Sequence, residues 1–178
     1  MMLRGDKVGL RILERNEDIE RILEGRSDRK VMGEFCPPQL VKKNDIFDKN
    51  KKPHFSQYVI FELKYPDIVV GEISFSRIEA ERSVFELGSW IFPEFRRKGY
   101  CKEAILILLD YLFLRVNTNR IQCQTHIDNT ASINLIQKVG FQKEGVLRQS
   151  IFLNGKWADI MIFSILRREW KEPKYLKC

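Results

Sequence analysis

Residues 93–101, Pro93-Glu94-Phe95-Arg96-Arg97-Lys98-Gly99-Tyr100-Cys101, stand between a predicted strand and the most strongly periodic helix of the chain. The helix is expected from Gly99 to Val116, where apolar residues recur at helical spacing. Because Ile107 and Tyr111 widen its apolar face further, we expect the helix to be buried against a sheet. A strand, a basic turn and a buried helix in this order point to an α/β fold.

The chemistry of this turn is that of a phosphate cradle. The first amides of a helix have no partner within it, and the helix dipole adds positive potential at the same end. Gly99 lets the backbone approach a ligand closely, while Arg96, Arg97 and Lys98 add charge. Neither GxxxxGK[ST] nor GxGxxG is present, so the cradle belongs to another phosphate-binding design. A basic helix start that faces only solvent is the alternative interpretation.

The remaining pattern predicts one domain over residues 1–170, built on a mixed α/β sheet. Turn residues predict hairpins at Pro66-Asp67 and Asn154-Gly155, and Gly140 is placed for a left-handed helix cap. Residues 33–56 hold three prolines and five lysines and are predicted to be a loop, either a solvated surface or a lid. The charged end from Arg167 to Cys178, including the tail 171–178, is expected to fray. Strands are predicted over 8–13, 58–63, 68–75, 84–92, 120–125, 141–152 and 157–166, and helices over 18–23, 99–116 and 129–139.

The net charge, the cysteine and histidine content and the apolar runs limit which partners and sites the sequence favours. The 178 residues contain 31 Lys+Arg and 24 Asp+Glu, a net charge of +7, which leaves anionic partners such as a nucleotide cofactor or nucleic acid open. Four cysteines without a CxxC unit and only two histidines argue against a zinc site, and no metal is predicted. No signal peptide or bilayer-spanning apolar run is recognisable, so we expect a reduced, cytoplasmic protein with no membrane partner.

A second polar segment opens the predicted helix at residue 129. Asn129 or Thr130 can cap that helix, and Ser132 falls in its first turn, where a hydroxyl can face a ligand. Taken together, the segments resemble the GNAT N-acetyltransferase superfamily, in particular its RimJ/RimL-like branch, whose named members acetylate N-terminal amines of ribosomal proteins. The resemblance covers roughly residues 7–170. It is carried by Arg96-x-x-Gly99-x-Cys101, Asn129-x-x-Ser132 with Gly140-Phe141, Glu144-Gly145-x-Leu147-Arg148, Asn154-Gly155-x-Trp157-x-Asp159 and Glu169-Trp170.

The resemblance implies a mostly antiparallel sheet of seven strands, splayed in the middle and flanked by helices, with acetyl-CoA as cosubstrate. Its pantetheine arm would pair with the backbone near Trp90, Ile91 and Phe92, and would contact Asn129. The side chain of Arg96 belongs to the same cofactor signature. The diphosphate would rest on the amides of Arg97, Lys98, Gly99, Tyr100, Cys101 and Lys102.

Two departures from the family pattern affect catalysis. Ile136 stands where many members carry a tyrosine that protonates the departing thiolate, so Ser132 is the candidate for that task. Ile151 falls where RimL-type members carry a glutamate base. Glu86 is therefore our first candidate for the general base, ahead of Glu72 and His126. Cys101 or Cys123 as an acyl-carrying nucleophile is disfavoured, because no His/Asp partner is evident.

The predicted function is transfer of an acetyl group to a primary amine within a ternary complex. An α-amine with a pKa near 8 is easier to deprotonate than a lysine near 10.4, which favours a protein N-terminus as acceptor. Polyamines and antibiotics remain alternative acceptors, although the lysines between 42 and 52 would repel a polycation. A cofactor-binding homologue with little activity and a non-enzymatic nucleic-acid or ribosome-binding module are further alternatives, and a homodimer is left open.

Overall fold

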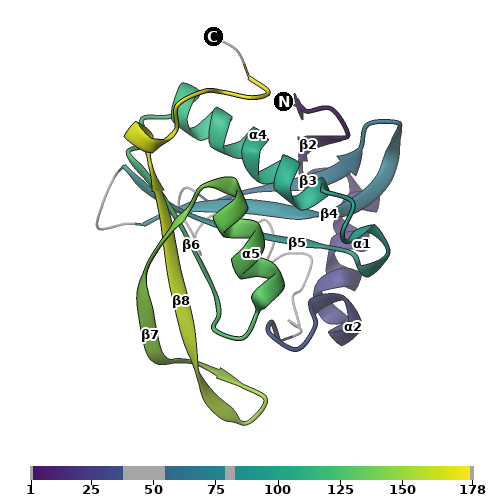
Figure 1. Cartoon of the computed structure of the whole chain (residues 1–178). Helices are drawn as coiled ribbons and strands as arrows, with labels where there is room; N and C mark the ends of the chain where they lie inside the picture. The colour runs from purple at the N-terminus through teal and green to yellow at the C-terminus, as the bar shows by residue number, and fades with distance from the viewer. Residues whose placement is uncertain (1, 38–54, 79–82, 177–178) are drawn as a thin grey trace.

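The computed structural model describes residues 2–37, 55–78 and 83–176 (Figure 1). Its strands form one eight-stranded sheet in the order β1-β2-β3-β4-β5-β6-β8-β7, in which β5 and β6 alone run parallel. The predicted mixed, mostly antiparallel sheet is confirmed, with the short β1 as an additional strand. The elements are β1 (Met2–Arg4), β2 (Val8–Ile12), α1 (Asn16–Ser27), α2 (Arg29–Met32), β3 (Phe55–Glu62), β4 (Tyr65–Arg77), β5 (Val84–Ile91), the 3₁₀ turn η1 (Pro93–Phe95), α4 (Tyr100–Arg115), β6 (Arg120–His126), α5 (Thr130–Val139), β7 (Gln142–Leu153), β8 (Lys156–Leu166) and the 3₁₀ turn η2 (Arg167–Glu169).

Helices cover the two faces of the sheet unequally. The larger core joins α4 and α5 to one face and includes Leu108 and Phe113, both almost fully buried. The smaller core joins α1, through Ile19 and Ile22, and α2, through Val31, to the other face. Along β3, Tyr58 and its neighbours alternate between the two cores, as a strand covered on both faces requires. The buried central helix predicted from Gly99 to Val116 is therefore confirmed as α4.

The hairpin between β3 and β4 turns earlier than predicted. The turn residues are Leu63 and Lys64, while Pro66 and Asp67 lie within β4. Register shifts at the end of β3 accommodate the proline, and Arg11 donates a hydrogen bond to the Pro66 carbonyl at 2.6 Å. The long-range bond to Arg11, which local turn chemistry does not encode, explains why the strand continues through these residues.

The C-terminal segment is docked, so the prediction of a frayed end is wrong for residues 167–176. The amides of Lys174, Tyr175 and Leu176 donate to one carboxylate oxygen of Asp110, at 2.9, 2.6 and 3.1 Å. Asp110 lies fully buried on α4. In the sequence this aspartate interrupts the apolar stretch from Ala104 to Leu114, and no local pattern indicates its partners.

The predicted loop over residues 33–56 lies largely outside the described residues, and so does its lysine cluster. The part that is described, residues 33–37, follows α2. It contacts the β7–β8 turn, where the Glu34 carbonyl accepts from Asn154, and the end of β6, where Phe35 packs on His126. Among the described residues, no helix is both long and apolar enough to cross a membrane.

Candidate active site

The sheet opens between its two parallel strands. β5 and β6 pair at only three positions, the last of which joins Glu86 to Gln122. Beyond Glu86, β5 continues to pair with β4 but not with β6. Gly88 and Ser89 are consequently exposed in the middle of the sheet. We call this opening, between residues 87–91 of β5 and 123–126 of β6, the split (Figure 1).

Strand alternation decides which amides of β5 face the split. The Phe92 amide donates to the Val70 carbonyl of β4 at 3.0 Å, so Phe92 and, by alternation, Trp90 point toward β4. Ser89 and Ile91 point the other way, into the split. Of the three residues predicted to pair with the cofactor arm, the geometry leaves only Ile91 with a free amide there. Ser89 was missed, because its direction depends on a register that the sequence does not state.

The start of α4 presents a set of unpartnered amides. No side chain caps the helix, and no described oxygen accepts from the amides of Lys98, Gly99, Tyr100, Cys101 or Lys102. Gly99 has φ 85°, a left-handed conformation that glycine adopts readily, and Arg97 has φ 63°, which is uncommon for a residue with a side chain. A Cβ placed on Gly99 would lie 4.0 Å from the Lys7 ammonium nitrogen.

These features fit a diphosphate. Free amides converge at the positive end of a 16-residue helix, and the exposed side chains of Arg97, Lys98 and Lys102 surround them. Lys7, from the turn before β2, adds a cation that sequence reasoning missed, because nothing local in the sequence brings residues 7 and 99 together.

Two side chains of the predicted cradle segment are engaged elsewhere: that of Arg96, which was predicted to add charge, and that of Tyr100, of which only the amide was predicted to bind. The Arg96 guanidinium donates to the Val31 carbonyl and to the Ile91 carbonyl, so this side chain ties α2 to β5. The Tyr100 hydroxyl donates to Glu62 at 2.6 Å, which is the main cause raising the pKa of Tyr100 to about 12. For Tyr100 the structure leaves the amide, not the side chain, available to a ligand.

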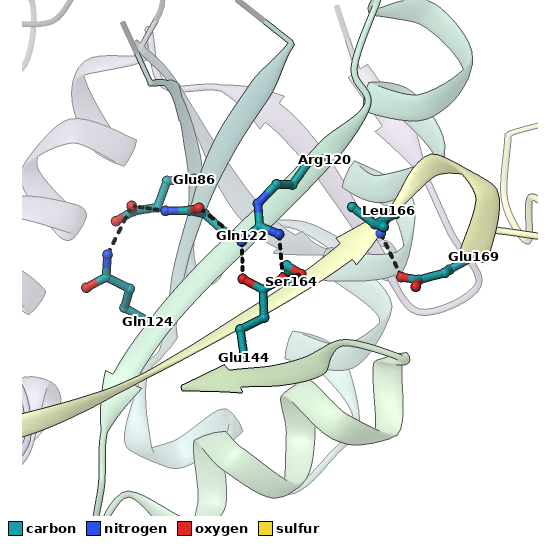
Figure 2. Close-up of polar contacts among 8 residues, drawn as sticks. All are labelled: Glu86, Arg120, Gln122, Gln124, Glu144, Ser164, Leu166 and Glu169. Atoms are coloured by element: carbon teal, nitrogen blue, oxygen red, sulfur yellow. Dashed lines mark hydrogen bonds and ion pairs between the residues drawn. The ribbon is translucent and has the colours of Figure 1, made fainter. Parts of the chain in front are cut away.

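The candidate proton acceptor stands where the split begins. One carboxylate oxygen of Glu86 accepts from Gln122 at 3.2 Å and from Gln124 at 3.3 Å, as Figure 2 shows. The other oxygen has no partner among the described residues. Glu86 is half-buried on the sheet face opposite α4, because its neighbours Phe85 and Leu87 belong to the core under that helix.

The two weaker base candidates are less available. Glu72 is 2% exposed and accepts from Arg26, Gln57 and Trp90, so both of its oxygens are occupied by donors. The His126 Nδ1 accepts from the Asp128 amide at 3.1 Å, which leaves the proton of the neutral ring on Nε2. Neither group offers a free lone pair in this arrangement.

Helix α5 begins beside the far end of β6. The Asn129 side chain accepts from the Ser132 amide at 3.1 Å, so Asn129, one of the two caps that the sequence left open, is the N-cap and Thr130 is not. The Nδ2 atom of the Asn129 side chain and the half-buried Ser132 hydroxyl keep no partner among the described residues. Ile136, one turn further, is buried in the larger core.

The cysteines are poor nucleophiles. Cys123 is buried, and burial raises the pKa of its thiol to about 12. Cys101 lies on α4 with its sulfur 3.4 Å from the Ser89 hydroxyl, and burial raises its pKa as well. Both thiols therefore stay protonated near neutral pH, which argues against an acyl-carrying cysteine.

Comparison with known proteins gives this geometry a family. The sequence profile of the family described as "Acetyltransferase (GNAT) domain" matches residues 7–142. An uncharacterized N-acetyltransferase of Bacillus licheniformis, p20, is 35% identical over 127 residues, which cover 71% of this chain and 69% of the relative. A putative ribosomal N-acetyltransferase of Bacillus subtilis, YdaF, is 31% identical over 112 residues, 63% of this chain and 61% of the relative.

A solved structure shares the whole architecture. Spermidine N-acetyltransferase from Vibrio cholerae, in complex with CoA and spermine, superposes with a TM-score of 0.80 at 24% identity, covering 97% of this chain and all of that one. The named relatives thus include proteins assigned to ribosomal and to polyamine acceptors. The chain belongs to the GNAT acetyltransferase family and is an acetyl-CoA-dependent N-acetyltransferase.

Proposed function

We propose that the acceptor is the N-terminal α-amine of a protein, with Glu86 receiving its proton. The observation that carries this proposal is the one carboxylate oxygen of Glu86, at the start of the split, to which no described residue donates. A carboxylate is a weak base, and a weak base suits an amine that is already partly neutral. A water molecule can relay the proton where the distance requires it.

The free-energy difference between acceptors is large. At pH 7 an α-amine with a pKa near 8 costs about 1.4 kcal/mol to deprotonate, and an alkyl amine near 10.4 costs about 4.6 kcal/mol. The gap of about 3.2 kcal/mol corresponds to a neutral fraction roughly 200-fold larger for the α-amine, and to the same ratio of rates for acceptors of equal position and nucleophilicity. No second free carboxylate accompanies Glu86 in the described part of the split to offset this cost.

The other residues of the site would bind acetyl-CoA and polarise its thioester carbonyl. Acetyl-CoA supplies the acetyl thioester, and the amides at the start of α4 together with Lys7 would hold its diphosphate. The Ser89 and Ile91 amides would hold the pantetheine arm as an added strand, and a β5 amide in the split would polarise the thioester carbonyl. The Ser132 hydroxyl would donate to the departing sulfur, a role that the buried Ile136 cannot take.

The test is an acceptor panel. The purified protein is incubated with acetyl-CoA and one of three acceptors: a short peptide with a free N-terminus and no lysine, the same peptide Nα-blocked with one lysine, or spermidine. Thiol release gives kcat/KM, and mass spectrometry locates the acetyl group. We expect the free α-amine to exceed the lysine by about 200-fold.

Preference for spermidine or for the lysine peptide would contradict the proposed acceptor. If no acceptor raised thiol release above hydrolysis, and Ser132→Ala left the background unchanged, the catalytic roles of Ser132 and Glu86 would be wrong.

A further inference from the structure

The hairpin of β7 and β8 ends in an exposed aromatic pair. In Figure 1 the two strands extend well past α5. Phe152 is 57% exposed and Trp157 is 62% exposed, and their rings meet edge to face with centroids 5.4 Å apart. We call these two residues the aromatic tip. Such a rigid, solvated aromatic pair has no role in the core of this chain and is typical of binding surfaces.

The same hairpin carries cations without counter-ions. Arg148 and Lys156, on the part of the hairpin nearer the tip, are exposed, and no hydrogen bond or ion pair joins either side chain to a described residue. Lys143 is exposed as well, but it pairs with Phe163 at the other end of the hairpin. The carboxylates of the hairpin, in contrast, are occupied. Glu144 is held by Arg120 and Ser164, and Asp159 accepts the amide of Gln149 at 2.8 Å. The hairpin therefore presents a positive field around an apolar tip, which is complementary to an acidic surface.

A bulge joins this surface to the candidate active site. The β7–β8 register shifts between Leu147 and Ile151, and Gln149 adopts φ 47° there. The bulge borders an open groove of about 850 Å³, which residues 146–150 and Asp159 line. The Asp159 carbonyl accepts the Ile127 amide at 3.2 Å, two residues before the cap of α5. A chain bound along the hairpin would thus reach the mouth of the split.

We propose that the aromatic tip and the two cations on its side of the hairpin, Arg148 and Lys156, dock a folded acidic protein, whose N-terminal segment then follows the bulge into the split. The proposal rests on the N-terminal acceptor proposed above and adds the chemistry of the acceptor's folded part. A second copy fits this surface less well, because a two-fold contact of tip on tip would bring the same unpaired cations together. Single-stranded nucleic acid fits it less well, because the two rings occupy each other instead of offering a row of free faces.

The experiment separates docking from chemistry. One short N-terminal sequence is presented in three forms: as a free peptide, at the head of an acidic folded carrier protein, and at the head of a charge-reversed carrier. We expect KM for the acidic carrier to be about tenfold below that of the peptide. Phe152→Ala combined with Trp157→Ala should return it to the peptide value, with peptide kcat/KM unchanged. Arg148→Glu combined with Lys156→Glu should reverse the preference between the carriers.

Matched controls come from the opposite part of the sheet. Tyr65 on β4 is a comparably exposed aromatic residue at 50%, and Lys171 is an exposed cation away from the hairpin. Tyr65→Ala and Lys171→Glu should change none of these KM values.

Three results would overturn the docking proposal. The first is equal KM for peptide and carriers in the wild-type protein. The second is a dimer, seen by sedimentation, that only the tip variant dissolves. The third is loss of affinity for a single-stranded RNA oligonucleotide on tip substitution, without any change toward the carriers. Failure to acetylate the free peptide at all would instead contradict the proposed acceptor class, so the two proposals fail separately.

Discussion

At the scale of single residues, two buried or half-buried glutamates on neighbouring strands have opposite tasks. One oxygen of Glu86, beside the split, accepts from no residue that the structure describes, while both oxygens of Glu72 are bound by donors from α1, β3 and β5. The number of donors, not the residue type or strand position, separates a proton acceptor from a packing residue here. Sequence reasoning ranked Glu86 first but had no means to see the network that occupies Glu72.

Glu86→Gln is expected to lower kcat for the α-amine acceptor by about 100-fold or more, because the proton acceptor is lost. KM for acetyl-CoA and the melting temperature should change little. Glu72→Gln is the matched control: it leaves the buried Arg26 without its charge partner, so it should cost stability, on the order of 3 kcal/mol. The assignment of Glu86 as proton acceptor would be wrong if Glu72→Gln shifted the acid limb of the pH–rate profile and Glu86→Gln left that limb in place. Glu72 would then be the proton acceptor.

The ion pair of Glu144 makes stability depend on pH. Hydrogen bonds from Arg120 and Ser164 lower the pKa of Glu144 to about 2. The folded-state pKa lies below the unfolded value near 4.3, so the stabilisation is present above that value and is lost as pH falls toward 2. The side chain is 39% exposed, so solvent screening limits the contribution to about 1 kcal/mol at most.

Denaturant unfolding of wild type and Glu144→Gln should therefore differ at pH 7 and converge near pH 2. A difference that grows on acidification would contradict the assigned pKa shift.

At the scale of elements, the turn before α4 depends on a left-handed glycine, Gly99, to direct its amides toward a ligand. Gly99→Ala would force φ 85° on a residue with a side chain, so we expect the turn to relax and KM for acetyl-CoA to rise about tenfold, with a small loss of stability. Gly155→Ala is the matched control, because Gly155 has φ 80° and equally open space. With the short peptide as acceptor, Gly155→Ala should lose similar stability and keep KM unchanged. Equal KM effects at both glycines would refute a specific role for the α4 turn.

The C-terminal segment and α4 form one cooperative unit through Asp110. Truncation after Trp170 removes the three amides that bind its carboxylate, and Asp110→Ala removes the carboxylate. Each change should lower the free energy of unfolding by about 2–3 kcal/mol. The two losses should not add when combined, because they delete the same contacts. Additive losses in thermal unfolding would mean that the segment is held by other contacts.

At the scale of the whole molecule, local signals in the sequence were sufficient for much of the fold. The Asn154-Gly155 turn, the Gly140 cap and the apolar face of α4 are each encoded within a few residues, and each is confirmed. The errors share one cause. The continuation of β4 through Pro66 and the docking of the tail both depend on partners more than 50 residues away, Arg11 and Asp110.

The candidate site divides in the same way. The helix start, its glycine and its basic residues could be predicted, because a short motif carries all of them. Lys7, the direction of the Ser89 amide and the engagement of Arg96 could not, because they depend on tertiary packing and strand register.

The most direct test of the account is a crystal structure of the protein with coenzyme A. We expect the diphosphate within hydrogen-bonding distance of amides between Lys98 and Lys102. We expect the pantetheine arm inside the split, accepting a hydrogen bond from the Ser89 or Ile91 amide. A diphosphate bound anywhere else, or an arm that lies outside the opening between β5 and β6, would contradict the account.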